Sequence, residues 1–251
     1  MTKRFENQVA LVTGGARGIG AGIGERLAAE GARVILWDIL PDILNEACAE
    51  MSQRGLSVSG MAIDITDEEQ VKSAFATIFE TWGRLDIVVN SAGIIGPSST
   101  KITKYSYADF RNVVEVNLNA SFLITKYAIP YMEKNHYGRI LLVASIGGKE
   151  GNPGMAGYAA SKSGVIGLVK GIGKEYAGTG ITVNGIAPAV ISTPMNLDTD
   201  PQMLQYMVDK IPMKRLGTVE EVASLAAWIV SPEASFNTGF VFDLSGGRAT
   251  Y

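Results

Sequence analysis

Short apolar runs alternate with longer stretches of mixed apolar and polar residues along the whole chain. The runs are rich in strand formers and have the length of strands that are buried on both faces, whereas the stretches between them read as helices. Alternating strands and helices predict an α/β fold, in which right-handed crossovers cover both faces of a parallel sheet with helices. We expect seven strands, at residues 9–13, 32–37, 57–63, 85–89, 139–144, 181–187 and 239–244.

The chain contains no linker, internal repeat or low-complexity segment. Its 251 residues, 47% of them apolar, are enough for one α/β domain with a substantial core, since such folds often reach this size undivided. We therefore expect residues 1–251 to form a single domain.

The first apolar run leads into a glycine-rich turn, and residues 21–30 beyond it read as a helix. Strand, glycine turn and helix form the context that a phosphate-binding loop requires. Gly14, Gly18 and Gly20 let the backbone approach a pyrophosphate closely, and the start of the helix offers free N–H groups. Glycines also serve ordinary strand-to-helix turns, so the assignment depends on the residues that follow.

The second predicted strand ends in Asp38. Its distance from the glycine turn is close to the roughly 20 residues expected for the acid that binds an adenine ribose. The alternative is that Asp38 caps a helix that starts near Pro41.

Tyr158 and Lys162 are four residues apart, so on a helix they lie on one face. A free tyrosine has a pKa of about 10, and a neighbouring ammonium favours the phenolate and lowers that pKa. The pair would then be able to move a proton near neutral pH. Surface helices also carry this spacing by chance, so the pair alone does not identify an active site.

Several motifs together resemble the classical short-chain dehydrogenases/reductases. They are Thr13-Gly14-x-x-x-Gly18-Ile19-Gly20, Asn90-Ser91-Ala92-Gly93, Asn117, Ser145 and Tyr158-x-x-x-Lys162. The resemblance runs from Val9 to Gly247 and implies a Rossmann-like doubly wound domain with strand order 3-2-1-4-5-6-7. Two positions depart from the family pattern: Ser91 replaces a second asparagine, and Ala189 replaces the glycine that commonly follows Pro188.

The resemblance assigns catalysis to Asn117, Ser145, Tyr158 and Lys162. It implies that Tyr158 takes the proton of a substrate hydroxyl while Ser145 donates a hydrogen bond to the same oxygen. Lys162 is expected to lower the pKa of the tyrosine and to bind the nicotinamide ribose. Asn117 falls within a predicted helix at residues 107–133, which the family kinks so that a main-chain carbonyl holds a water near Lys162.

We expect the cofactor to be NAD. A carboxylate at Asp38 bonds well to a ribose diol and repels the 2′-phosphate of NADP, although Arg17 stands where NADP-using relatives often place a basic residue. Asp64 is expected to hold the adenine edge or, alternatively, to cap the helix that starts near Asp67. The expected cofactor-binding residues are Gly14, Arg17, Gly18, Ile19, Gly20, Asp38, Asp64, Ile65, Asn90, Ala92, Gly93, Tyr158, Lys162, Pro188, Val190, Ile191 and Thr193.

Residues 145–153 and 242–251 resemble a subgroup that oxidises 2-keto-3-deoxy sugar acids derived from L-rhamnonate or L-fuconate. The expected substrate-binding residues are Ser145, Lys149, Asn152 and Tyr158, although the loop after Ser145 also reads as an ordinary solvated segment. We expect a substrate lid at about residues 190–215, whose methionines, Met195, Met203, Met207 and Met213, close over a ligand or pack the lid onto the body.

Two other functions remain open. The first is a 3-oxoacyl-acyl-carrier-protein reductase, for which a basic docking patch and a preference for NADP would be expected. The net charge of −3 and Asp38 both speak against that enzyme. The second is a nucleotide-binding regulator without chemistry, since fold alone never settles function. Such a regulator would be expected to lack Tyr158 or Lys162.

Composition predicts few kinds of partner. The acidic net charge argues against nucleic acid, the single Cys48 fits a reducing cytoplasm, and the lone His136 makes a metal site improbable. No segment has the length of a membrane span or the core of a signal peptide.

We expect a homotetramer because small residues recur along the helix that begins near Tyr158, unless they pack on the protein's own sheet. These residues are Ala160, Gly164, Gly167 and Gly171. Residues 248–251 are expected to reach the lid of a neighbouring subunit.

Overall fold

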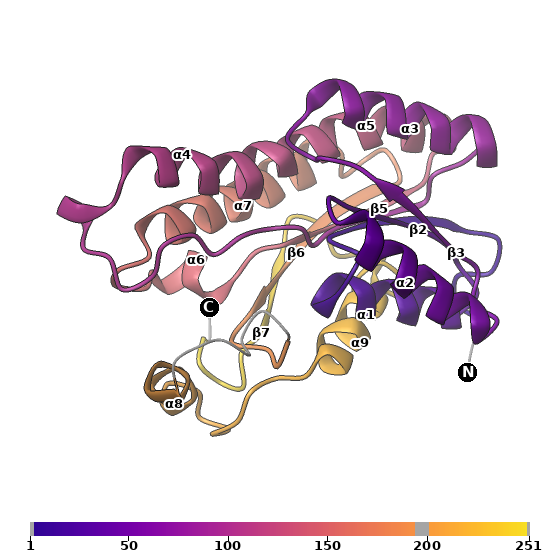
Figure 1. Ribbon diagram of the computed structural model, residues 1–251. Coiled ribbons are helices and arrows are strands. Elements are labelled where there is room, and N and C mark those ends of the chain that lie inside the picture. Colours follow the sequence, from indigo (N-terminus) through magenta and orange to yellow (C-terminus); the bar gives the residue numbers. More distant parts are fainter. Residues whose placement is uncertain (1–2, 194–200, 250–251) are drawn as a thin grey trace.

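The computed structural model describes residues 3–193 and 201–249 and contains one seven-stranded sheet (Figure 1). All strands are parallel, in the order β3-β2-β1-β4-β5-β6-β7, which confirms the predicted Rossmann-like topology. The strands are β1 (Val9–Thr13), β2 (Arg33–Asp38), β3 (Val58–Ala62), β4 (Ile87–Asn90), β5 (Gly138–Val143), β6 (Ile181–Pro188) and β7 (Val241–Leu244).

Helices cover both faces of the sheet (Figure 1). One face carries α1 (Gly18–Ala29), α2 (Pro41–Gln53) and α9 (Val219–Ile229). The other carries α3 (Glu68–Trp82), α4 (Tyr107–Val114), α5 (Ala120–Lys134) and α7 (Ala156–Glu175). The shorter elements are α6 (Ile146–Glu150), α8 (Pro201–Asp209), η1 (Ile102–Lys104) and η4 (Pro232–Ala234).

Alternation along the strands divides the core into two clusters. In β1, Val9 and Leu11 pack under α3 and α5, whereas Ala10 and Val12 pack under α1 and α9. Successive side chains of a strand point to opposite faces, so a central strand must be apolar throughout. This explains why the central strands read as continuous apolar runs rather than as alternating ones.

Two helix boundaries differ from the sequence-based expectation. The first helix begins at Gly18 rather than at residue 21, so the last two glycines of the motif belong to its first turn. The helix expected at residues 107–133 is interrupted by a single π-helical turn, η2 (Glu115–Asn119), which separates α4 from α5. Asn117 lies in this turn and is fully buried.

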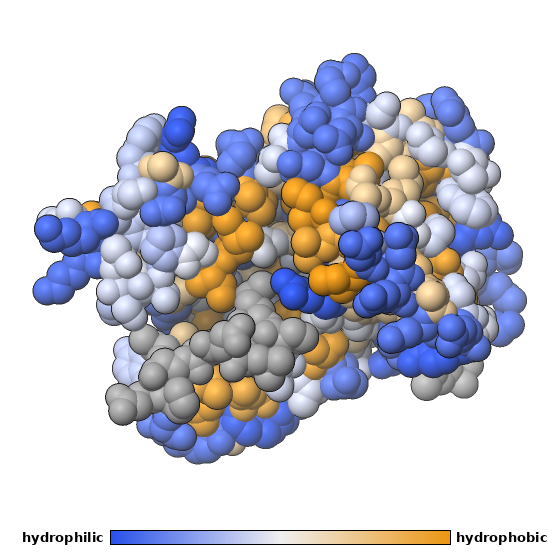
Figure 2. Space-filling model, in the orientation of Figure 1, coloured by the Kyte–Doolittle hydropathy of each residue, from blue (hydrophilic) through white to orange (hydrophobic). Residues whose placement is uncertain are grey.

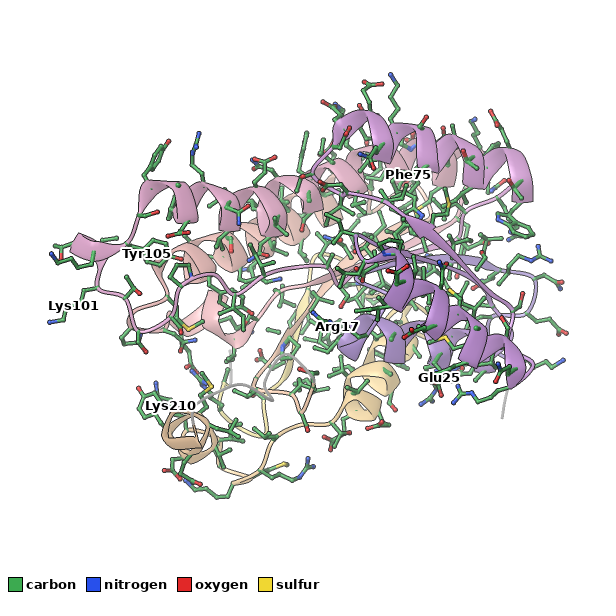
Figure 3. The ribbon with its side chains drawn as sticks, in the orientation of Figure 1. Arg17, Glu25, Phe75, Lys101, Tyr105 and Lys210 are labelled. Carbon is green, nitrogen blue, oxygen red and sulfur yellow. The ribbon has the colours of Figure 1, made fainter. Side chains whose placement is uncertain are left out.

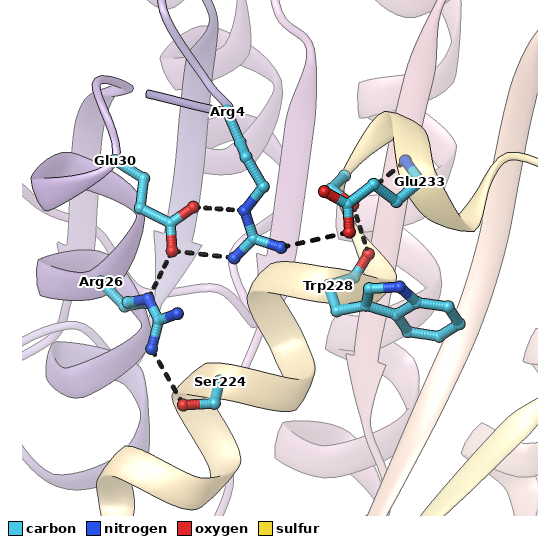
Figure 4. A network of polar contacts seen from close by, with 7 residues as sticks. Arg4, Arg26, Glu30, Ser224, Trp228 and Glu233 are labelled. Atoms are coloured by element: carbon cyan, nitrogen blue, oxygen red, sulfur yellow. Dashed lines mark hydrogen bonds and ion pairs between the residues drawn. The ribbon is translucent and has the colours of Figure 1, made fainter. Parts of the chain in front are cut away.

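A cluster of ion pairs anchors the amino-terminal segment to the helices below the sheet (Figure 4). The carboxylate of Glu30 accepts hydrogen bonds from both Arg4 and Arg26. Arg4 also pairs with Glu233, and Arg26 donates to Ser224 on α9. A buried carboxylate is tolerated only when it is paired in this way, so the cluster joins three separate segments.

Candidate active site

A cavity of about 280 Å³ opens at the carboxyl ends of the central strands. Its walls include Gly93 after β4, Ser145 after β5 and Val190 after β6. On the face shown in Figure 2, hydrophilic residues lie mostly toward the outside and hydrophobic residues gather toward the middle. Ligands of doubly wound sheets bind at this edge, so the cavity is the candidate active site.

The glycine turn leaves no room for a side chain at Gly14 or Gly20. A Cβ at Gly20 would lie 2.1 Å from the carbonyl oxygen of Gly14, and one at Gly14 would lie 2.9 Å from the backbone of Ala92. Gly14 and Gly18 also have positive φ angles, of 65° and 61°. The free N–H groups at the start of α1 therefore stand beside an open backbone loop, which suits a pyrophosphate. Arg17 precedes this helix and is exposed (Figure 3).

Asp38 joins the end of β2 to the glycine turn. Its Oδ2 atom accepts a hydrogen bond from the N–H of Ala16 at 3.0 Å, and its Oδ1 atom accepts one from the N–H of Leu40 at 3.2 Å. The N-cap of α2 is Leu40, without a side-chain cap, so the interpretation of Asp38 as that cap is wrong. The carboxylate is half-buried and stands at the edge where an adenine ribose is expected.

Asp64 and Ile65 follow β3 at the same edge of the sheet. The Oδ1 atom of Asp64 accepts from the N–H and the hydroxyl of Thr66, at 2.9 and 2.7 Å. Asp67 is the residue that caps α3, so the interpretation of Asp64 as that cap is wrong. Ile65 is buried beside it.

A chain of buried hydrogen bonds links the glycine turn to the π-helical turn. The N–H of Ala92 donates to the hydroxyl of Thr13 at 3.2 Å, and that hydroxyl donates to the Oδ1 atom of Asn90. The Nδ2 atom of Asn90 donates to Ser121 at 2.9 Å, and Ser121 donates to the main-chain carbonyl of Asn117 at 2.6 Å. The main-chain carbonyl of Asn117 thus accepts one hydrogen bond from a buried side chain.

The side chain of Asn117 fixes the loop that follows β4. Its Oδ1 atom accepts from the N–H of Ile94 at 2.8 Å, and its Nδ2 atom donates to the carbonyl of Ile94 at 2.9 Å. The same Nδ2 atom donates to the hydroxyl of Ser161 on α7 at 3.0 Å. Asn117 therefore holds a cavity wall against the helix that carries Tyr158 and Lys162.

Tyr158, Ser145 and Lys162 meet on the wall of the cavity. Ser145 and Tyr158 line the same wall, where a Cβ on Gly147 would lie 3.5 Å from Oγ of Ser145 and 3.4 Å from Cε1 of Tyr158, and Ser145 accepts from the N–H of Gly147 at 3.1 Å. Lys162 is buried, donates to the carbonyl of Val143 at 2.7 Å and lies 6.0 Å from the centroid of the Tyr158 ring. The structure thus brings these three residues together on one wall.

Burial controls the proton affinities of this pair. It raises the pKa of Tyr158, which the hydrogen bond with Ser145 partly opposes, and it lowers the pKa of Lys162 to about 8. The expectation that Lys162 lowers the pKa of the tyrosine is therefore not met in this arrangement. Spacing along a helix reveals that two groups share a face, but it does not reveal how deeply both are desolvated.

The substrate-binding residues expected from the sequence are only partly brought together. Asn152 lines the cavity with Ser145 and Tyr158. Lys149 does not line it, because its Nζ atom lies 2.9 Å from the carboxylate of Asp243 on β7. Arg248, the first of the residues expected to reach a neighbouring subunit, lines the cavity of its own chain. No local pattern marks Arg248 as a cavity residue, since its partners lie about a hundred positions earlier.

The expected lid falls partly within the described residues. Residues 194–200, with Met195, lie outside them, as does the side chain of Met203. Tyr206 and Met207 of α8 line the cavity, whereas Met213 is exposed. Four further predicted cofactor residues, Pro188, Val190, Ile191 and Thr193, line the cavity where the chain leaves β6.

Within residues 3–193 and 201–249, no group of three or more histidine, cysteine, aspartate or glutamate side chains is placed to hold a metal ion. Over the same residues, no helix is long and apolar enough to cross a membrane. Cys48 lies half-buried on α2, and burial raises the pKa of its thiol.

Known proteins resemble the chain over nearly its full length. The family model described as enoyl-(acyl carrier protein) reductase matches residues 14–249. The 2-dehydro-3-deoxy-L-rhamnonate dehydrogenase (NAD(+)) of Sphingomonas sp. (strain SKA58) is 41% identical, with 99% of this chain and 98% of that protein covered. The 3-oxoacyl-[acyl-carrier-protein] reductase of Thermotoga maritima is 38% identical, with 97% and 98% covered. The crystal structure of NAD⁺-bound xylitol dehydrogenase superposes with a TM-score of 0.92 at 30% identity, covering 97% of this chain and 99% of that one.

Proposed function

This chain belongs to the classical short-chain dehydrogenases/reductases, and from that premise we propose that it oxidises a secondary hydroxyl of a sugar acid with NAD. The proposed substrate class is a 2-keto-3-deoxy-L-sugar acid such as 2-keto-3-deoxy-L-rhamnonate. The observation that carries the chemistry is that Tyr158, Ser145 and the buried Lys162 meet in one cavity. The substrate class rests on the relative that is 41% identical over 99% of the chain.

The residues present fit NAD. The bare backbone of the glycine turn and the start of α1 would hold the pyrophosphate, and Asp38 would accept hydrogen bonds from the adenine ribose. Gly93 keeps the floor of the cavity open, since a Cβ there would lie 3.0 Å from Asn117 and 3.4 Å from the Nζ atom of Lys162. Lys162 would bind the nicotinamide ribose. NAD, when bound, supplies the acceptor for the hydride of the substrate carbon.

The chain's own groups move the proton. The phenolate of Tyr158 takes the proton from the substrate hydroxyl, and Ser145 donates a hydrogen bond to the same oxygen as its charge changes. Because burial raises the pKa of Tyr158, a positive charge must offset that effect when the site works. Lys162 is the cationic side chain nearest in sequence on the same helix face, and its pKa of about 8 leaves it mostly protonated at neutral pH.

A second candidate is a 3-oxoacyl-acyl-carrier-protein reductase, which is favoured by the relative that is 38% identical. The two functions share Tyr158, Ser145 and Lys162, so the catalytic groups do not separate them. They differ in cofactor, in direction and in the charge of the substrate. Asp38 speaks for NAD and thus for the dehydrogenase.

The decisive experiment measures NADH formation from NAD, and separately NADPH formation from NADP, with a panel of 2-keto-3-deoxy sugar acids, aldoses and polyols. A 3-oxoacyl thioester is assayed in the opposite direction with NADH and NADPH. NAD-linked turnover of a deoxy sugar acid with the highest kcat/KM of the panel is the expected result. Turnover restricted to NADPH and the thioester would overturn the proposal in favour of the reductase.

We further propose a homotetramer that works in the cytoplasm. Of the small residues on α7, Gly164 packs against Leu118 of its own chain, whereas a Cβ at Gly167 or Gly171 would meet nothing within 4 Å. These two glycines therefore have no packing role within the described chain, and an approaching helix of another subunit would account for them. Sedimentation or light scattering measures the assembly, and a monomer would refute it.

A further inference from the structure

The cavity is cationic in an acidic protein. The charged residues that line it within the described chain are Lys162, Lys210 and Arg248, and no aspartate or glutamate lines it there. The whole chain carries a net charge of −3. Lys162 serves the proton-transfer pair, and Lys210 lies just beyond α8 near the rim (Figure 3). Arg248 is therefore the cation whose purpose in the cavity needs an explanation.

Arg248 is held rigidly but keeps hydrogen-bonding capacity. Its side chain is only 5% exposed. The Nε and Nη2 atoms donate to the Oε2 atom of Glu150 at 3.0 and 2.8 Å, and Nη2 also donates to the Oδ1 atom of Asn152 at 3.1 Å. A guanidinium has five N–H donors, and no group in the described part of the chain accepts from Nη1. Two donors thus remain on an arginine that lines the cavity.

Asn152 connects this arginine to the reacting groups. Its Nδ2 atom lies beside Gly147: a Cβ there would be 2.9 Å from that atom, 3.4 Å from Cε1 of Tyr158 and 3.5 Å from Oγ of Ser145. Asn152 therefore stands between the guanidinium and the proton-transfer pair. Its Nδ2 atom, like Nη1 of Arg248, donates to no group of the described residues.

We propose that Arg248 and Asn152 form the carboxylate-binding end of the substrate site. Nη1 of Arg248 binds the carboxylate of the sugar acid, and Nδ2 of Asn152 donates to an oxygen between that carboxylate and the hydroxyl at Tyr158. Glu150 orients the guanidinium through the opposite edge of its fork. A planar, pre-oriented arginine suits a carboxylate better than a lysine does. The inference rests on the proposed function, because it names what selects acids over neutral sugars.

Two measurements test this site separately from turnover. Calorimetry on the enzyme saturated with NADH measures the binding of 2-oxobutyrate and of its methyl ester, which lacks the charge. The variant Arg248→Met is expected to bind 2-oxobutyrate about 10- to 100-fold more weakly, with the ester unaffected. In steady state, KM for the deoxy sugar acid rises by a similar factor while kcat changes less.

The matched control is Arg54→Met, which removes an arginine at the carboxyl end of α2 that pairs with Glu25 of α1 at 2.7 Å and does not line the cavity. This variant should bind 2-oxobutyrate and its methyl ester with unchanged affinity. Glu150→Gln tests the contact that orients the guanidinium, and it is expected to weaken the binding of 2-oxobutyrate less than Arg248→Met does. Equal weakening of acid and ester in Arg248→Met would show that Arg248 only ties the tail to α6, and would overturn the inference.

The remaining outcomes distinguish this inference from the proposed function. No binding of 2-oxobutyrate to the wild type, or unchanged binding in Arg248→Met, overturns the carboxylate site even if sugar acids are oxidised. Selective loss of 2-oxobutyrate in Arg248→Met, combined with no turnover of any sugar acid, supports an acid-binding site and refutes the proposed substrate.

Discussion

The cavity has a nucleotide side, at the glycine turn, and a substrate side, near Arg248. The first presents main-chain atoms to a ligand, whereas the second presents side chains. On the nucleotide side the backbone makes the surface, and the glycines at positions 14 and 20 are needed because any Cβ would strike the neighbouring main chain. On the substrate side, side chains make the surface, among them Asn152 and the Arg248 that Glu150 holds. A surface of backbone suits a ligand shared by many enzymes, whereas a surface of side chains can change its preference by single substitutions.

Tyr158→Phe tests the region where the two sides meet and should have the largest effect. Loss of the phenolic hydroxyl removes the proton acceptor, so kcat should fall by about 10²- to 10⁴-fold. The affinity for NAD, measured by fluorescence titration, should change little. The control is Tyr127→Phe, whose hydroxyl donates to Glu68 on the exposed surface. Near-normal turnover in Tyr158→Phe would refute the mechanism.

Two substitutions in α1 test whether a new methyl group that meets main-chain atoms is more damaging than one that meets a side chain. Gly20→Ala forces a methyl group against the carbonyl of Gly14, so the loop must move and kcat/KM for NAD should fall by roughly 10²-fold. In Gly22→Ala, the new methyl meets a Val219 side chain of α9 instead. That variant should lose about 1–3 kcal/mol of unfolding free energy and keep its affinity for NAD. Similar losses of NAD affinity in both would contradict the comparison.

The burial of Lys162 makes the free energy of unfolding depend on pH. Its pKa is about 8 in the folded chain against 10.5 ordinarily, so between these values the unfolded chain binds a proton that the folded chain does not. The free energy of unfolding should therefore rise with pH above 8, by roughly 2 kcal/mol up to pH 10. Urea unfolding measures the slope, which should be absent in Lys162→Met. A wild-type profile parallel to that of the variant would show that Lys162 is not desolvated.

Asp38→Ala should have the smallest effect, confined to the choice of nucleotide. Without the carboxylate, the ratio of kcat/KM for NAD to that for NADP should fall by about tenfold. Asp42→Ala, on the exposed first turn of α2, is the control. An unchanged ratio in Asp38→Ala would show that Asp38 serves only its contacts with Ala16 and Leu40 and does not select the nucleotide.

The structure brings together the residues that the sequence assigned to the nucleotide side, because the signals that mark them are local. The glycine turn, Asp38 and the pair of Tyr158 and Lys162 each depend on short spacings that strand and helix geometry convert directly into position. The parallel sheet and its strand order also followed, from alternating elements and from the family resemblance.

The substrate side was harder to predict because its contacts join distant segments. Lys149 was expected in the cavity but pairs with Asp243, and Arg248, expected to reach a neighbouring subunit's lid, lines the cavity of its own chain. Similarly, the pKa of Tyr158 depends on burial, which no spacing reveals. Only the packing of α6 against the carboxyl-terminal tail decides which of these charges faces the ligand.

The π-helical turn η2 determines how the chain would respond to the deletion of one residue. Such a turn holds one residue more than a regular helix, and each residue rotates a helix by about 100°. Because the wider turn takes up that extra residue, deleting one residue at η2 would restore a regular helix with α4 and α5 still nearly in line, and would turn only the residues of η2 itself. Asn117 would then swing away from Ile94 and Ser161, so the deletion would act at the active site although every catalytic side chain were still present.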